Sequence, residues 1–287
     1  MSAAERVGSP RLRPLAAWGR LLASELRLIF GRRRNQVGLA ALFGLVVLVG
    51  VALKVSSLRH PGSPGGDLMS AVAGNGIFLG FAGLSIEIAL FLPLAVSVLA
   101  GDAIAGEANQ GTLRYLLIAP VSRARLLFMK AVSLAIGALT GAAVVAVGGL
   151  LTGAVLFGVG PLITLSGSTI GVGDGLVRLL LAVLYLVAGL TSLAMIGLFI
   201  STLTEQPIAA TVATAMLGTL LWILDAVPQL DWLHPWLLVD RWMAFIDLLR
   251  EPIFTDRLIA GLWVDLAYAV VFFGLAWLRF RNKDVTS

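Results

Sequence analysis

Runs of about 20 mostly apolar residues follow one another along this chain of 287 residues, and they constrain the fold more than any other feature. Each run is long enough for a helix to cross a hydrocarbon core of about 30 Å. Only 13% of the residues are charged, whereas an ordinary soluble domain carries about 25%. The sequence therefore predicts an all-α integral membrane protein with little chain left over for a soluble domain.

The apolar runs divide the chain into two predicted parts. Residues 1–35 are expected to form a cytoplasmic N-terminal segment, and residues 36–287 a transmembrane domain of six helices. The third run is longer than one crossing, so its start is expected to continue a cytoplasmic helix. A helical segment near Trp232–Leu249 is expected on the outer side. The six predicted spans cover residues 36–55, 77–100, 126–157, 176–202, 208–224 and 258–280.

Lysine and arginine residues indicate the orientation. Fifteen of them lie in residues 1–35, in residues 101–130 and after the last span, whereas six lie in the opposite connections. Cytoplasmic loops carry the excess of these residues, so both termini and residues 101–130 are predicted to lie in the cytoplasm, with the chain in the cell membrane. Trp232, Trp236 and Trp242 then belong to the outer interface. The same rule explains the net charge of +5 without nucleic acid as a partner.

Residues 12–30 show helical spacing with one apolar and one polar side. A helix of this kind, with arginines on its polar side, is expected to lie on the anionic cytoplasmic leaflet of the bilayer. A soluble packing helix is the alternative. The apolar side carries Leu15, Trp18, Leu22, Leu26 and Ile29, and the polar side carries Arg13, Arg20, Ser24 and Arg27.

The connection between the second and third runs, residues 101–125, is predicted to hold a short helix off the membrane. Gly111 permits a sharp turn and Thr112 can cap a helix whose apolar side is Leu113, Leu116 and Leu117. Pro120 ends that helix, and Ser122 can cap the next one. Asp102 and Glu107 are expected at the end of the second span, where water or a partner can solvate them. An ordinary polar loop is the alternative, but about thirty residues from Gly101 to Lys130 favour a docking surface.

These residues resemble a family. The pattern Asp102-Ala103-Ile104, Gly106-Glu107, Gly111-Thr112-Leu113, Leu116-Leu117, Pro120, Arg123, Leu127 and Lys130 is similar to the signature of permease subunits of type 2 (ABC-2-like) ATP-binding-cassette exporters. Met129 departs from it, because a glycine often precedes the lysine. The motif covers about thirty residues, whereas the likeness in layout covers most of the chain.

The resemblance implies a transport role with separate ATPase subunits. Two permeases, identical or paralogous, would join two nucleotide-binding subunits that supply ATP and Mg²⁺ chemistry. The segment from Glu107 to Arg123 would be a coupling helix seated in a groove of the ATPase, with the N-terminal helix beside it. The coupling residues implied are Glu107, Gly111, Thr112, Leu113, Arg114, Leu116, Leu117, Pro120 and Arg123.

The sequence carries no catalytic or cofactor motif of its own. Its lysines are Lys54, Lys130 and Lys283, and none belongs to a phosphate-binding loop. No metal site is expected, because cysteine is absent and both histidines precede prolines in outer connections. We therefore expect a transport subunit rather than an enzyme, with no cofactor in this chain.

Glu87 stands out because it lies near the middle of the second span. A carboxylate there is costly unless it faces water or a partner, so Glu87 is a candidate for the translocation pathway; a hydrogen-bonded packing residue is the alternative. Glycine pairs, Gly76 and Gly80 on the second span and Gly149 and Gly153 on the third, permit close helix contacts within one subunit or between two.

Two other functions remain open at this point. An ATP-independent carrier would transport without a partner, and a membrane enzyme would act on a lipid-soluble substrate. Neither explains the segment from residue 101 to 130.

Overall fold

A computed structural model describes residues 14–59, 75–111 and 122–282. The prediction of an all-α chain with helices able to cross a membrane is confirmed, because five helices are long and apolar enough, or six if one bent pair is a single span. The helices are α1 (Pro14–Gly31), α2 (Arg33–Arg59), α4 (Gly76–Glu87), α5 (Phe91–Asp102), α6 (Ala105–Asn109), α8 (Arg123–Phe157), α9 (Val172–Leu203), α10 (Pro207–Asp225) and α11 (Thr255–Arg281).

Helix α9 is the centre of the bundle. It packs against α4, α5, α8, α10 and α11, and 67% of its most apolar window is buried, compared with 11% for α11 and 17% for α2. The outer faces of α2, α10 and α11 carry many exposed large apolar side chains. This distribution suits a bundle whose perimeter faces lipid, because lipid tails solvate such side chains.

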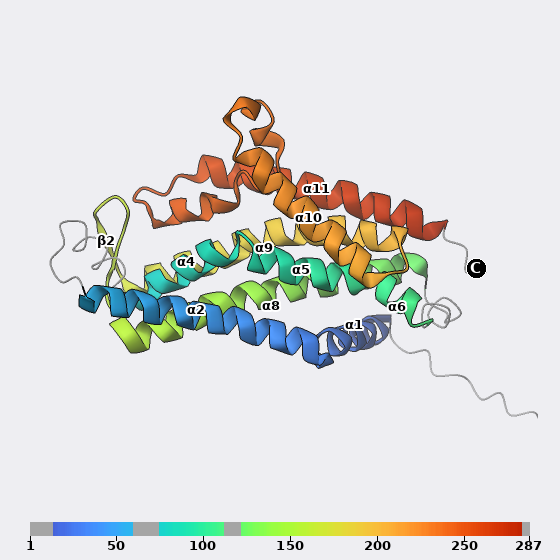
Figure 1. Cartoon of the computed structure of the whole chain (residues 1–287), viewed down its shortest axis with the longest axis horizontal. Coiled ribbons are helices and arrows are strands. Elements are labelled where there is room, and N and C mark those ends of the chain that lie inside the picture. Colours follow the sequence, from blue (N-terminus) through green and yellow to red (C-terminus); the bar gives the residue numbers. More distant parts are fainter. Residues whose placement is uncertain (1–13, 60–74, 112–121, 283–287) are drawn as a thin grey trace, which may run out of the picture.

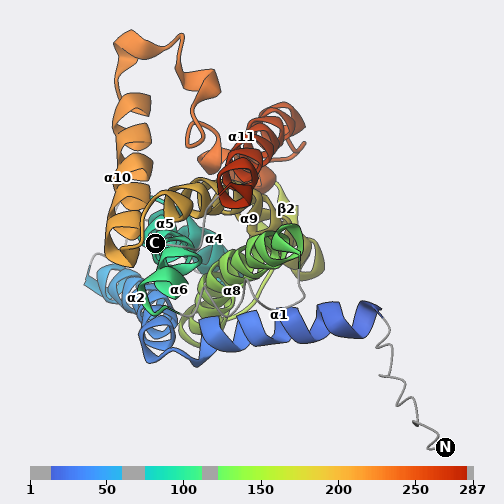
Figure 2. The same ribbon diagram turned by 90° about the vertical axis from the view of Figure 1, so that its right-hand side faces the viewer.

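Helices α1 and α6 and the last turn of α11 lie at one end of the long axis, and a small hairpin lies at the other (Figure 1). The hairpin pairs β1 (Leu162–Ile163) with β2 (Thr169–Ile170) in antiparallel register. Figure 2 shows α1 running across the direction of the other helices. Its apolar stripe faces inward, since Trp18, Leu22 and Leu26 are partly buried while Arg20 and Arg27 are exposed.

The second apolar run is a broken helix. Helices α4 and α5 meet at an angle of 59°, and residues 88–90 form the break. Pro93 explains it, because a proline has no N–H to offer the carbonyl four residues earlier, and its ring clashes with that carbonyl. Glu87 is the last residue of α4, so this carboxylate lies directly beside the break.

Glycines hold α4 against α8. A methyl group built at Gly149 would lie 2.7 Å from the Gly80 Cα and from the Leu79 carbonyl oxygen, and one at Gly76 would lie 2.6 Å from the Ala154 nitrogen. Backbones approach this closely only where side chains are absent. The two glycine pairs therefore pack within one subunit.

The chain between α10 and α11 reaches the middle of the bundle. Its 3₁₀ helices are η1 (Pro228–Leu230), η2 (His234–Trp236) and η3 (Trp242–Leu249). The Tyr268 hydroxyl, at the middle of α11, donates to the Trp236 carbonyl at 3.0 Å. The Tyr185 hydroxyl, near the middle of α9, donates to the Arg241 carbonyl at 2.8 Å. Residues 236–241 thus lie beside the middle of two long helices.

Two expectations about this half of the chain were wrong. Trp242 was expected at the outer interface, but its side chain is 2% exposed, because Gly189 leaves room on α9 for the indole ring. The fourth span was expected to begin at residue 176, but α9 begins at Val172. The start of the third helix agrees with expectation, because the Ser122 hydroxyl accepts from the Arg125 N–H at 3.3 Å.

The close glycine contact predicts that the substitution of glycine by alanine has opposite effects on stability at two helix positions. Gly149→Ala should lower the free energy of unfolding by about 1–3 kcal/mol, because the methyl group would push α8 from α4. Gly274→Ala in α11 should raise it by up to about 1 kcal/mol, because nothing lies within 4 Å of the added methyl group and alanine favours the helix. Denaturant unfolding in detergent micelles measures both; equal effects would contradict the close packing.

Candidate functional site

The joint between α5 and α6 is fixed by a side chain from α9. The Ser201 hydroxyl accepts hydrogen bonds from the backbone N–H groups of Ile104 at 3.1 Å and Ala105 at 2.8 Å. It donates to the Gly101 carbonyl at 2.8 Å. Ser201 is fully buried, so these backbone groups are satisfied where water is excluded. The short helix α6 is therefore anchored to the central helix of the bundle.

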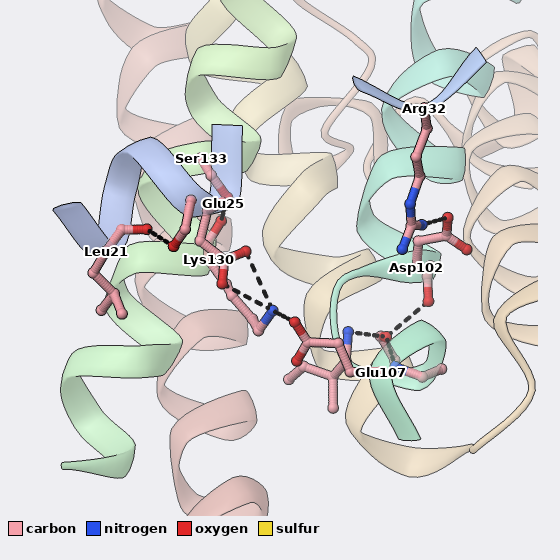
Figure 3. A network of polar contacts seen from close by, with 12 residues as sticks. Leu21, Glu25, Arg32, Asp102, Glu107, Lys130 and Ser133 are labelled. Carbon is pink, nitrogen blue, oxygen red and sulfur yellow. Dashed lines mark hydrogen bonds and ion pairs between the residues drawn. The ribbon is translucent and has the colours of Figure 1, made fainter. Parts of the chain in front are cut away.

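Lys130 joins three helices through a buried ion cluster, which we define as Glu25, Glu107 and Lys130 (Figure 3). The Lys130 ammonium of α8 lies 2.6 Å from Glu107 Oε1 of α6 and 3.3 Å from Glu25 Oε2 of α1. All three residues are at most 8% exposed. A buried charge is costly without a partner, so the cation and the two carboxylates hold α1, α6 and α8 together.

The two carboxylates compete for one ammonium group. Burial raises the pKa of the Glu107 carboxyl, and Lys130 counteracts that rise. A cavity of about 40 Å³ lies among the cluster residues and Asp102, which is room for about one water molecule. The cluster therefore places three charged groups and a small polar cavity between packed helices.

A second ion contact lies beside the cluster and fixes the start of α2 (Figure 3). The Asp102 carboxylate at the end of α5 lies 2.5 Å from Arg32 Nη1 and also pairs with Arg34 Nη2. Both arginines contact the same oxygen atom, Oδ2. Two guanidinium groups on one carboxylate leave an excess of positive charge at this corner.

The structure corrects one prediction about the implied coupling residues. Glu107 was expected where water or a partner could solvate it, but it is buried against Lys130 of the same chain, because α1 covers this end of the bundle. Gly111 is exposed and has a φ of +69°, which glycine adopts without strain. Arg123 donates from Nη1 to the Arg281 carbonyl at 2.9 Å, so it contacts the end of α11. The remaining implied residues, Thr112, Leu113, Arg114, Leu116, Leu117 and Pro120, lie outside the described residues.

The sequence analysis did not predict that Glu25 and Lys130 lie together in an ion cluster, although Lys130 belongs to the family pattern. Glu25 is seven residues after Trp18 and four before Ile29, which places it within the apolar stripe of the N-terminal helix. An acidic residue at such a position signals a buried partner. Lys130 is a lone lysine at the start of a long apolar run, and long cations there need a carboxylate or the membrane surface.

Glu87 lies apart from the ion cluster. It is fully buried, and neither carboxyl oxygen has a hydrogen-bond partner among the residues that the structure describes. A buried carboxyl group without partners lowers stability, and such groups are retained mainly where function needs them. Glu87 at the helix break therefore remains a candidate for the translocation pathway.

Asp265 of α11 is also buried. It lies in the eleventh position of a 27-residue helix, and its backbone carbonyl accepts from the Ser192 hydroxyl at 2.7 Å. The contact with α9 covers this side of α11, which accounts for the burial.

The comparisons with known proteins give a family without a described activity. The model of a family described as "Protein of unknown function (DUF2705)" matches residues 71–286. The chain belongs to this family. Among curated proteins no match was found. The DUF2705 match covers α4 to α11 and includes Glu107 and Lys130, whereas Glu25 lies before it.

Lys130→Met should strongly destabilise the fold, because it leaves two buried carboxylates without their cation. We expect a loss of about 3–5 kcal/mol in the free energy of unfolding. The triple variant Glu25→Gln, Glu107→Gln, Lys130→Met, which carries no buried charge, should recover most of that loss. Arg34→Gln removes one of two cations from Asp102 and should cost less than about 1 kcal/mol, because the Arg34 side chain is 55% exposed and Arg32 stays in place. Unfolding in detergent measures all three, and no recovery in the triple variant would contradict the ion cluster.

Glu87→Gln should leave the fold intact and change its stability by less than about 1 kcal/mol, because the amide has almost the same shape as the carboxyl group and no described contact is lost. Ser85→Ala serves as a control on the same helix, since it removes a hydroxyl that donates locally to the Phe81 carbonyl. Thermal unfolding measures both variants. A clear loss of stability in Glu87→Gln would assign Glu87 a packing role instead.

Proposed function

We propose that this chain is the membrane-spanning permease subunit of an ATP-driven exporter of the type 2 ATP-binding-cassette class. The observation that carries the proposal is the bridge from Lys130 to Glu25 and Glu107. It joins the helices that flank residues 112–121, the segment whose sequence resembles a coupling helix. A helix that receives force from a partner must be held firmly to the bundle, and the ion cluster holds α6 to α1 and α8.

The arrangement offers a route for force. Helix α6 is fixed to α9 through Ser201, and α8 begins one residue after Ser122 and continues for 35 residues. Residues 112–121 connect these two helices. A displacement of that segment by an ATPase would therefore act on α8 directly and on the central helix through α6.

Orientation follows from charge and arrangement together. Helices α1 and α6 and the end of α11 lie at one end of the bundle (Figure 1), and that end carries most of the arginines among the described residues. The positive-inside rule favours the cytoplasm for it. We propose six spans, with α4 and α5 forming one, and both termini in the cytoplasm of a cell-membrane protein. The partners would be two ATPase subunits, which bind ATP and Mg²⁺, and a second permease copy.

One observation favours a different function, an ATP-independent carrier. Carriers place substrate sites at broken helices near the middle of the membrane, and the break between α4 and α5 lies next to the buried Glu87. A carrier would transport in vesicles without any ATPase. The proposed exporter would transport only when the ATPase subunit and ATP are present.

The test places a photoreactive amino acid at Leu116 of the chain in the membranes of the cells that make it. Irradiation should join it to a polypeptide that carries a phosphate-binding loop, identified by mass spectrometry. The same probe at Leu165, which is half exposed near the hairpin at the opposite end, should capture no such polypeptide. Absence of an ATPase from the Leu116 products of an active complex would refute the proposal.

A charge reversal offers an independent check. Arg114→Glu should release the ATPase during purification of the complex, because it places a negative charge at the proposed contact. Arg250→Glu, on an arginine near the opposite end, should leave the ATPase bound. The amount of ATPase that co-purifies with the chain is the measurement, and equal retention in both variants would count against the proposed contact.

A further inference from the structure

An apolar groove on the side of the bundle has no assigned occupant. Its volume is about 500 Å³, and it lies between α2, α5 and α8. Along α2 it extends from Asn35 to Leu48, which corresponds to about 20 Å of helix. That length is close to one leaflet of the hydrocarbon core, which is about 15 Å thick.

Two glycines of α2 keep the groove open. Gly38 and Gly44 line it, and nothing lies within 4 Å of a Cβ built at either residue. Glycine inside a helix costs about 1 kcal/mol relative to alanine. At Gly149 and Gly153 close backbone contact explains the glycine, but no contact among the described residues explains Gly38 or Gly44. Their effect is to leave space in the groove.

The mouth of the groove is cationic. Arg34 lies at its edge, together with Asn35, and Arg32 and Arg33 are the neighbours in sequence. Asp102 supplies one carboxylate to Arg32 and Arg34, and the Arg34 side chain remains 55% exposed. A guanidinium has five N–H donors, so most of those of Arg34 point to no described protein partner and suit phosphate oxygens.

We propose that this groove binds an anionic phospholipid, with one acyl chain between α2 and α5 and the phosphate at Arg33 and Arg34. The groove is apolar for its whole depth and positively charged at the end where α1 crosses the bundle (Figure 2), which is the pattern of a lipid with a charged head. A second copy of this chain fits less well. In a two-fold arrangement it would bring its own Arg33 and Arg34 to the same depth, where like charges repel.

The experiment uses the full chain in phosphatidylcholine vesicles that contain a trace of a photoactivatable phosphatidylglycerol with its reactive group on the acyl chain. Peptides from residues 35–48 and 91–99 should be labelled about tenfold more by this probe than by the matching phosphatidylcholine probe. The phosphatidylglycerol head offers the arginines a net negative charge, whereas the choline group of phosphatidylcholine places a positive charge beside the phosphate. Equal labelling by the two probes would overturn the proposal.

Two sets of variants test the two halves of the site. Gly38→Leu with Gly44→Leu should abolish labelling in the groove by both probes, whereas Gly274→Leu, at an equally open position on α11, should change nothing. Arg33→Gln with Arg34→Gln should reduce phosphatidylglycerol labelling to the phosphatidylcholine level. Arg33→Lys with Arg34→Lys should keep part of the difference, and size-exclusion profiles verify that each variant is folded.

The chain contains no cysteine, so a single introduced thiol reports on the competing occupant. Gly44→Cys in the same vesicles should form no disulfide-linked dimer under mild oxidation if lipid fills the groove. Rapid disulfide dimers would assign the groove to a second copy and overturn the lipid proposal. None of these measurements needs an ATPase, so their outcome is independent of the transport function proposed above.

Discussion

The buried Lys130 ammonium determines how one end of this protein is built. A cation at 2% exposure requires negative partners, and it finds them on α1 and α6, 105 and 23 residues away in the sequence. Removing Lys130 would leave two buried carboxylates without their cation. Helices α1, α6 and α8 therefore separate only if the charges become hydrated together, which makes this end of the bundle a unit rather than three independent elements.

The broken helix divides the bundle into two halves with different contacts. Helix α4 packs on α8 through the glycine pairs, whereas α5, after the break at residues 88–90, packs mainly on α10 and α9. A straight helix would have kept one set of neighbours along its whole length. Glu87 lies at the joint between the two sets, where small changes in the angle between α4 and α5 alter its surroundings most. A buried carboxyl group without a described partner is therefore placed where a change in helix angle would affect it.

Local signals in the sequence predicted the helices well, because apolar length and Ser122 as a cap act over a few residues. The ion cluster was not predictable in the same way, since Glu25 meets Lys130 only through packing of helices whose relative rotation no local pattern specifies. Pro93 was a readable signal for the break in the second span. The burial of Trp242 depended on Gly189, more than fifty residues away, and on a chain path toward the middle of the bundle.

Helix α8 connects the ion cluster to the close contact with α4. It begins at the end where the ion cluster lies, and at its other end Gly149 and Gly153 hold α4 in backbone contact. A rigid helix of 35 residues spans about 50 Å, so a tilt imposed beside Lys130 reaches α4 and changes its angle to α5. In the proposed exporter, force from an ATPase would therefore arrive at Glu87 through α8 and, by a second path, through α6 and α5. The lipid groove lies between α2, α5 and α8, and any such tilt must also widen or narrow it.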